Sequence, residues 1–172
     1  MSTSKPTSSA LRLPVADLLR RPGAARELGL AVPLPRLGNG VAELPDGATV
    51  RIDGSLEQVA DGIVVRATIN APWRAACSRC LRPVTGNVTV HVDELFEPVP
   101  LEGETYRLDD DVLDLESLVR DALLLDLPAA PVCDPDCAGL CPSCGADRNE
   151  APCECRNDDS DPRWAALRSL EL

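Results

Sequence analysis

The sequence predicts an α+β fold, in which a small antiparallel sheet with packed helices carries a zinc-stapled Cys-rich C-terminal segment. Three observations support this. Apolar and polar residues alternate between residues 50 and 96, as on strands with one buried face. A leucine-rich run over residues 115–127 follows helical spacing. Residues 128–160 are rich in Cys, Pro, Gly and Asp without periodicity, so something other than an apolar core must order them.

The N-terminal third gives only weak structural signals. Residues 1–10 lack the apolar stretch of a secretion signal and are expected to form a disordered leader. Leu11–Val15 alternates and predicts a short strand. Residues 16–21 and 24–28 predict two short helical turns, separated by a Pro-Gly pair. Residues 29–47 are rich in Pro and Gly and predict a loop or linker.

Three strands are predicted next, joined as a meander. The first covers residues 50–57, and Asp61-Gly62 is a hairpin signal. The second and third cover residues 63–76 and 83–97, and the connection between them holds a C-x2-C pair. The pattern indicates one buried face but does not determine whether the sheet closes into a barrel.

The leucine-rich run predicts the main helix. Asp114 can cap it, Glu116 complements the dipole in its first turn, and Pro128 ends it. Three consecutive leucines at 123–125 point in different directions around a helix, so they extend beyond a single apolar stripe. The helix is therefore expected to be buried on most sides, with docking of a partner as the alternative.

A short terminal helix is predicted after Asp161-Pro162, with Trp164 docked on the body. The expected organisation is then a leader over residues 1–10, an α+β core over 11–132 and a Cys-rich zinc-binding tail over 133–172.

Charge is distributed unevenly along the chain. The net charge is -11, yet residues 1–36 carry +4, residues 37–92 carry 0, residues 93–126 carry -10 and residues 127–172 carry -5. Nucleic acids are bound mainly through Lys and Arg and, when single-stranded, through aromatic residues, of which the chain has two Trp, one Tyr and one Phe. The acidic block over residues 93–126 favours a basic protein partner, the alternative being a solvated face that aids solubility.

Eight cysteines are the strongest chemical signal. Without an export signal, a reducing cytoplasm is expected, where clustered cysteines bind metal more often than they form disulfides. Zinc takes four tetrahedral ligands, and a C-x2-C turn presents two thiolates to one ion. All eight are predicted metal ligands for two structural Zn²⁺ ions: Cys77, Cys80, Cys133, Cys137, Cys141, Cys144, Cys153 and Cys155.

The preferred partition places the last four cysteines on one ion and the first four on the other, so that the second site staples the sheet to the tail. The rival partition groups Cys133, Cys137, Cys141 and Cys144. In either arrangement four cysteines occupy all four positions on the zinc ion, whereas a catalytic zinc keeps one position open for water or substrate. The cysteine spacing of ferredoxins is absent, which argues against an iron–sulfur cluster. His91 lies in a strand pattern, and neither a ligand nor a base is expected there.

Three segments together resemble the YceD family, the large ribosomal RNA subunit accumulation proteins, in its Cys-rich actinobacterial-type form. They are Cys77-Ser78-Arg79-Cys80-Leu81-Arg82-Pro83, the run LESLVRDALLLDLPAAP over residues 115–131, and the segment 137–155 with the Asp161-Pro162-Arg163-Trp164 that follows it. The resemblance covers roughly residues 11–170. It implies a non-enzymatic role in accumulation of large-subunit ribosomal RNA and hence in ribosome assembly.

Three hypotheses follow for the mode of action. The first is an assembly factor that binds a ribosomal protein or large-subunit precursor through its acidic face, including Asp109, Asp110 and Asp111. The second is an RNA-binding zinc module that contacts ribosomal RNA through Arg74, Arg79 and Arg82. The third is a thiol-redox protein that uses Cys77 and Cys80. No membrane association is expected, because no apolar run approaches the length of a membrane span. No small-molecule substrate is expected either.

Overall fold

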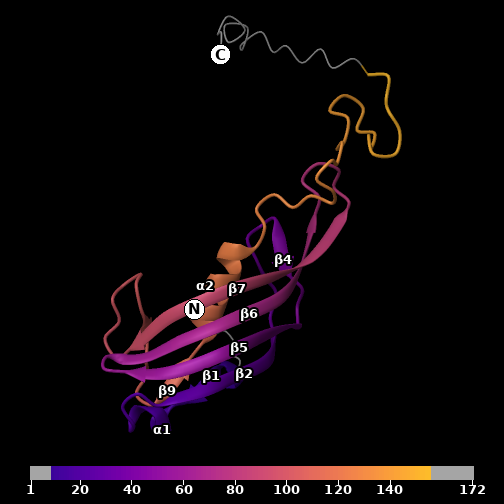
Figure 1. The fold of residues 1–172 in the computed structure, drawn as a ribbon. Coiled ribbons are helices and arrows are strands. Elements are labelled where there is room, and N and C mark those ends of the chain that lie inside the picture. The colour runs from indigo at the N-terminus through magenta and orange to yellow at the C-terminus, as the bar shows by residue number, and fades with distance from the viewer. Residues whose placement is uncertain (1–8, 156–172) are drawn as a thin grey trace, which may run out of the picture.

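The structure, a computed structural model, describes residues 9–155 and is built mostly of strands (Figure 1). The main sheet has seven strands: β2 (Ala25–Leu34), β3 (Leu37–Gly38), β4 (Ala42–Leu44), β5 (Ala48–Val59), β6 (Gly62–Ala76), β7 (Pro83–Glu97) and β8 (Tyr106–Arg107). A second, two-stranded sheet pairs β1 (Arg12–Pro14) with β9 (Val112–Asp114). The helical elements are η1 (Ser9–Leu11), the single turn α1 (Ala16–Leu19) and α2 (Glu116–Asp126).

The predicted three-strand meander is confirmed as β5, β6 and β7. The β5–β6 hairpin turns at Ala60 and Asp61, one residue earlier than the Asp61-Gly62 signal, since Gly62 already pairs with Val59; β6 pairs with β7 from Ile63↔Phe96 to Ala76↔Pro83. On the far side of β5 lies β2, while β4 and then β3 continue the sheet beside the end of β6. All pairings are antiparallel except that of β7 with β8. Over residues 9–155 the sheet is open rather than closed into a barrel.

The predictions for residues 24–47 were wrong. In place of a helical turn over 24–28 and a loop over 29–47, the chain forms β2, β3 and β4. Leu28, Val32 and Leu34 of β2 are buried and face the core with a period of two. Pro33 lacks an N–H donor, which a strand tolerates at the edge of a sheet, where β2 lies.

The apolar core lies between one face of the main sheet and the elements that cover it. Leu118, Val119 and Leu123 of α2 share this core with Ile63 and Phe96 of the sheet. Leu115 and not the predicted Asp114 is the N-cap of α2, but Oδ1 of Asp114 accepts the backbone N–H of Glu116 at 3.0 Å just before the helix. The expectation of several packed helices is met in part, because α2 is the one helix longer than a single turn among the described residues.

Only one face of α2 is buried, which corrects the expectation of burial on most sides. The side chain of Leu125 is 88% exposed, whereas Leu123 is fully buried and Leu124 is half-buried. One leucine of the three thus faces water.

The long hairpin of β6 and β7 positions the Cys-rich segment. Each strand has 15 residues, and their far ends project beyond the rest of the sheet (Figure 1). The chain after α2 returns to the tip of this hairpin, so that Cys77 and Cys80 meet the Cys-rich segment there. Residues 1–8 of the predicted leader and the predicted terminal helix lie outside the described residues, whereas Ser9 and Ala10 belong to η1. Within the described part, no helix has the length and apolarity that crossing a membrane requires.

Candidate metal centres

The eight cysteines gather into two groups of four. Cluster one consists of Cys77, Cys80, Cys133 and Cys137, and cluster two consists of Cys141, Cys144, Cys153 and Cys155. Within each cluster all sulfur atoms lie within 4.8 Å of one another. This grouping is the preferred partition of the sequence analysis, and the rival partition does not occur.

The two C-x2-C turns have the same backbone geometry. In cluster one the N–H of Cys77 donates to the carbonyl of Arg82, and the N–H of Leu81 donates to the carbonyl of Cys77. In cluster two the same two bonds are made at Cys141 and Gly145, at 2.8 Å each. The residue after the second cysteine has a positive φ in both turns, 63° at Leu81 and 75° at Gly145. Each turn therefore points two sulfur atoms to one side.

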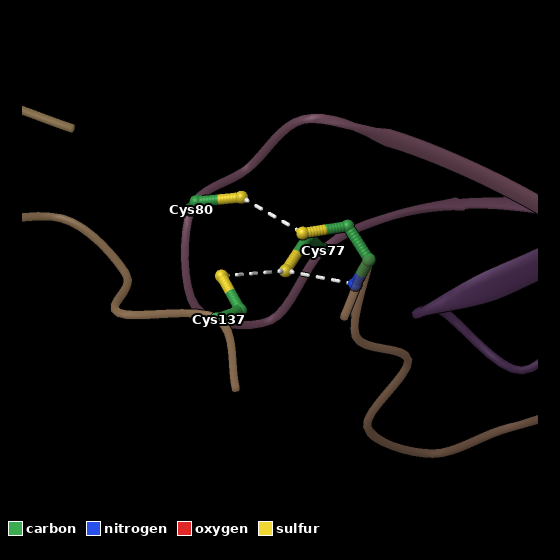
Figure 2. Close-up of side chains that lie close together, drawn as sticks. Cys77, Cys80 and Cys137 are labelled. Atoms are coloured by element: carbon green, nitrogen blue, oxygen red, sulfur yellow. Dashed lines mark hydrogen bonds between the residues drawn. The ribbon is translucent and has the colours of Figure 1, made fainter. Parts of the chain in front are cut away.

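Cluster one joins segments more than 50 residues apart. Figure 2 shows Cys77 and Cys80 on the connection between β6 and β7, with Cys137 approaching from the Cys-rich segment. The Sγ atoms of Cys77 and Cys137 are 3.9 Å apart, and those of Cys80 and Cys133 are 3.5 Å apart. Tetrahedral sulfur ligands at 2.3 Å from zinc lie about 3.8 Å from each other. The four sulfur atoms thus fit a single zinc ion.

The surroundings of Cys77 favour its thiolate. The backbone N–H groups of Cys80, Arg79 and Cys133 lower the pKa of Cys77 to about 6, against the opposing effect of burial. Two of these donors, on Arg79 and Cys133, lie 3.4 Å from its Sγ. A thiolate is the form of cysteine that binds metal. Cluster one therefore holds one thiol that is ionised at neutral pH before any metal arrives.

Two neighbouring thiols of cluster one, those of Cys133 and Cys80, have raised pKa values. A side-chain hydrogen bond with Cys80 is the largest contribution that raises the pKa of Cys133, to about 12. The N–H of Arg82 favours the Cys80 thiolate, but burial and the thiols of Cys77 and Cys137 outweigh it and raise the pKa of Cys80. Four thiols this close cannot all ionise unless a cation compensates their charge.

Cluster two repeats this chemistry in a more exposed place. The N–H groups of Cys144 and Ser143 lower the pKa of Cys141 to about 6, and a side-chain hydrogen bond with Cys144 raises that of Cys155 to about 12. Cys141 is buried, whereas Cys144 and Cys155 are exposed. All four ligand atoms come from 15 consecutive residues, so this cluster is local.

Polar contacts hold the two clusters together, and sequence reasoning missed them. The side-chain amide of Asn149 donates to the Sγ of Cys137 at 3.4 Å, and its Oδ1 accepts the N–H of Ala138. Asp147 fixes Asn149 by accepting its backbone and side-chain N–H groups at 2.9 and 2.7 Å. The only sequence signal was the Asp-x-Asn spacing, which is typical of a turn.

The three arginines predicted to contact a partner all have partners within the protein. Arg74 pairs with Glu43, and its Nη2 lies 2.7 Å from Oε1. Arg79 donates to the carbonyl oxygens of Pro135 and Cys137 at 2.9 and 3.0 Å. Arg82 pairs with Asp147 at 2.6 Å and with Glu150 at 3.1 Å. Arg79 and Arg82 thus tie the first C-x2-C turn to the tail.

The other predicted residues lie apart from the clusters. Asp109, Asp110 and Asp111 are exposed in the turn between β8 and β9. Asp109 accepts from Arg107 at 2.8 Å, and β9 lies at the opposite end of the sheet from the Cys-rich segment (Figure 1). His91 is exposed on β7, where its Nδ1 lies 3.0 Å from the hydroxyl oxygen of Thr68.

The clusters predict a pattern of thiol reactivity. In the protein purified with zinc, we expect iodoacetamide to leave all eight cysteines unmodified, and a chelator to make them reactive. Mass spectrometry of peptides after timed alkylation measures this. Rapid modification of Cys77 before chelation would instead support the thiol-redox hypothesis.

Together the fold and the clusters define a class: a β-rich protein with two closed four-cysteine clusters of zinc-site geometry. Comparison with known proteins defines the family. The family model described as "Large ribosomal RNA subunit accumulation protein YceD" matches residues 65–171, and the chain belongs to this family. That match spans the β6–β7 hairpin, α2 and both clusters.

Relatives extend the similarity over nearly the whole chain. An uncharacterized protein of Mycobacterium bovis is 40% identical over 168 residues, covering 93% of this chain and 81% of the relative. One of Mycobacterium leprae is 34% identical, covering 99% of this chain and 82% of the relative. The chloroplastic "Large ribosomal RNA subunit accumulation protein YCED homolog 1" of Arabidopsis thaliana is 31% identical over 58 residues, 34% of this chain and 18% of that protein. No solved structure matches.

Proposed function

We propose that this protein is a non-enzymatic factor that supports accumulation of large-subunit ribosomal RNA by binding a basic ribosomal protein or a large-subunit precursor. The observation that carries the proposal is its membership of a family described by that role. The names of its relatives mention no catalytic activity. Two Zn²⁺ ions, one in each cluster, would have a structural role, because four protein ligands leave no open position for a substrate.

The charge of the described surface supports a protein partner. The block over residues 93–126 carries -10, and most ribosomal proteins must be basic to bind RNA. In contrast, Arg74, Arg79 and Arg82 are engaged within the protein, which weakens the alternative of an RNA-binding zinc module. The burial of Cys77 and Cys80 inside a four-sulfur cluster weakens the redox alternative. Eight thiols without disulfides agree with a reducing cytoplasm as the site of action.

Affinity purification from a native host lysate tests the proposal. At about 50 mM salt we expect the tagged protein to retain large-subunit ribosomal proteins, and at about 500 mM salt to lose them, because screening weakens exposed charge pairs. Mass spectrometry identifies the proteins. Retention that disappears after nuclease treatment would support direct RNA binding, and the absence of ribosomal components at low salt would refute the proposal.

A further inference from the structure

A groove with acidic walls lies beside α2, and none of the eight cysteines lines it. Its volume is about 590 Å³. Three elements each supply a carboxylate: Glu94 on β7, Glu104 in the loop over residues 98–105, and Asp121 on α2. The apolar part of its lining is formed by Tyr106, Leu124 and Leu125. We call this surface the acidic groove.

Glu94 occupies a position where the strand pattern calls for an apolar residue. It pairs with Val65, which is 1% exposed, and lies two residues before the fully buried Phe96. Alternation places Glu94 on the same face of the sheet as Phe96, the face that α2 covers. An inward charge can also discourage strand addition at a sheet edge. Here, however, the carboxylate opens into a groove that two other elements also line with carboxylates.

The three carboxylates have no cationic partner within the part of the chain that the structure describes, since no Lys, Arg or His nitrogen lies within 4.0 Å of them. Tyr106 lies close to two of them, Asp121 and Glu94. Its hydroxyl lies 3.5 Å from Oδ2 of Asp121, and burial together with the charges of Asp121 and Glu94 raises its pKa. A cationic side chain entering the groove would find carboxylates that no internal cation neutralises.

The groove is also apolar on the side of α2. Leu125 is 88% exposed, the largest value among the exposed large hydrophobic residues of the described chain. Tyr106 stacks on Phe96 with ring centroids 5.1 Å apart, which fixes the aromatic part of the lining. An arginine or lysine side chain combines an aliphatic stem, which can cover Leu125, with a charged head for the carboxylates.

We propose that the acidic groove binds a segment of a partner protein in which basic and aliphatic side chains alternate. Charge complementarity identifies this occupant, because a nucleic acid would bring further negative charge to the three carboxylates. The inference rests on the proposed function, in that the groove would supply the contact to the basic ribosomal partner.

Fluorescence anisotropy with a labelled peptide of alternating arginine and leucine tests the groove in the full chain at low salt. We expect the triple variant Glu94→Gln/Glu104→Gln/Asp121→Asn to bind about tenfold more weakly than the unaltered protein, since three exposed charge pairs are lost. Leu125→Ser should also weaken binding without a change of charge. A peptide with citrulline in place of arginine should not bind measurably.

A matched control separates the groove from overall charge. The variant Glu27→Gln/Asp53→Asn/Asp61→Asn removes three carboxylates that form no ion pair within residues 9–155, and it should bind like the unaltered protein. Equal losses in both triple variants, or no loss with Leu125→Ser, would overturn the groove proposal. If the variant Glu94→Gln/Glu104→Gln/Asp121→Asn still retained ribosomal proteins from lysate, the groove proposal alone would be refuted. If the unaltered protein retained none, the proposed function would be refuted.

Discussion

Replacing Cys77 by serine should detach the Cys-rich segment from the sheet, whereas replacing Cys141 by serine should release only its last part. Each variant is expected to lower the zinc content from two ions to one. Structural zinc contributes about 10–16 kcal/mol of binding free energy in small zinc-binding peptides. The free energy lost with one site therefore exceeds the free energy that the remaining polar contacts can supply.

The difference arises from what each cluster joins. Cluster one links the tip of the β6–β7 hairpin to residues 133 and 137, and Arg79 and Arg82 add to that junction. Cluster two is local to residues 141–155 and would keep its ion after Cys77→Ser, on a segment no longer fixed to the sheet. The apolar core of the sheet and α2 contains none of the cysteines, so both variants should keep their strand content.

Limited proteolysis with a non-specific protease, followed by mass spectrometry, measures the outcome. Cleavage should begin between residues 127 and 141 in Cys77→Ser, but after residue 141 in Cys141→Ser. Ser78→Ala and Ser143→Ala are matched controls in the same two turns and should stay protected. If Cys77→Ser kept two zinc ions and resisted cleavage, cluster one would not be the staple proposed above. A chelator should expose the whole segment in the unaltered protein.

The partition of the cysteines could be predicted from the sequence as the preferred of two, because local spacing also allows the rival set of Cys133, Cys137, Cys141 and Cys144. Cys141, Cys144, Cys153 and Cys155 lie so close along the chain that a single ion can bind all four. Cys133 and Cys137 then remained as the partners of Cys77 and Cys80, which lie between two strands. The meander and α2 could be predicted for a similar reason, since each has a strong period of two or 3.6 residues.

The edge strand β2 was missed although its sequence carries a strand signal. Gly29 and Pro33 indicate a loop when read alone, yet Leu28, Leu30, Val32 and Leu34 keep a period of two. Proline is accepted in β2 because this strand is hydrogen-bonded to β5 on one side only. That β2 is an edge strand depends on how all the strands pair, which a local sequence pattern does not show.

The internal partners of the arginines also could not be predicted from the sequence. Arg82 and Asp147 are 65 residues apart, and their segments meet only in the folded chain, where the two cysteine clusters form. Pairing a charge with a distant segment leaves no periodic pattern. The acidic groove is similar, because its three carboxylates come from β7, a loop and α2 and become neighbours only in the folded chain.

Acidification should release zinc from cluster one steeply. The raised pKa values of Cys80 and Cys133 mean that both thiols are protonated at neutral pH without metal, while the pKa of Cys77 is about 6. Binding of zinc must therefore expel at least two protons, and each expelled proton weakens binding tenfold per unit fall in pH. Between about pH 6 and 8 we expect the zinc affinity to fall at least about 100-fold per pH unit.

Competition with a chromophoric chelator of known pH dependence measures this slope. The variant Cys141→Ser/Cys144→Ser isolates cluster one, because it removes two ligands of the local site and leaves the knuckle at Cys77 intact. Below about pH 6 the slope should steepen, since Cys77 then gains a proton as well. A slope of tenfold per pH unit or less would mean that the thiols are already ionised in the metal-free protein. In that case the hydrogen-bonded, protonated cluster described above would not be the state that binds the ion.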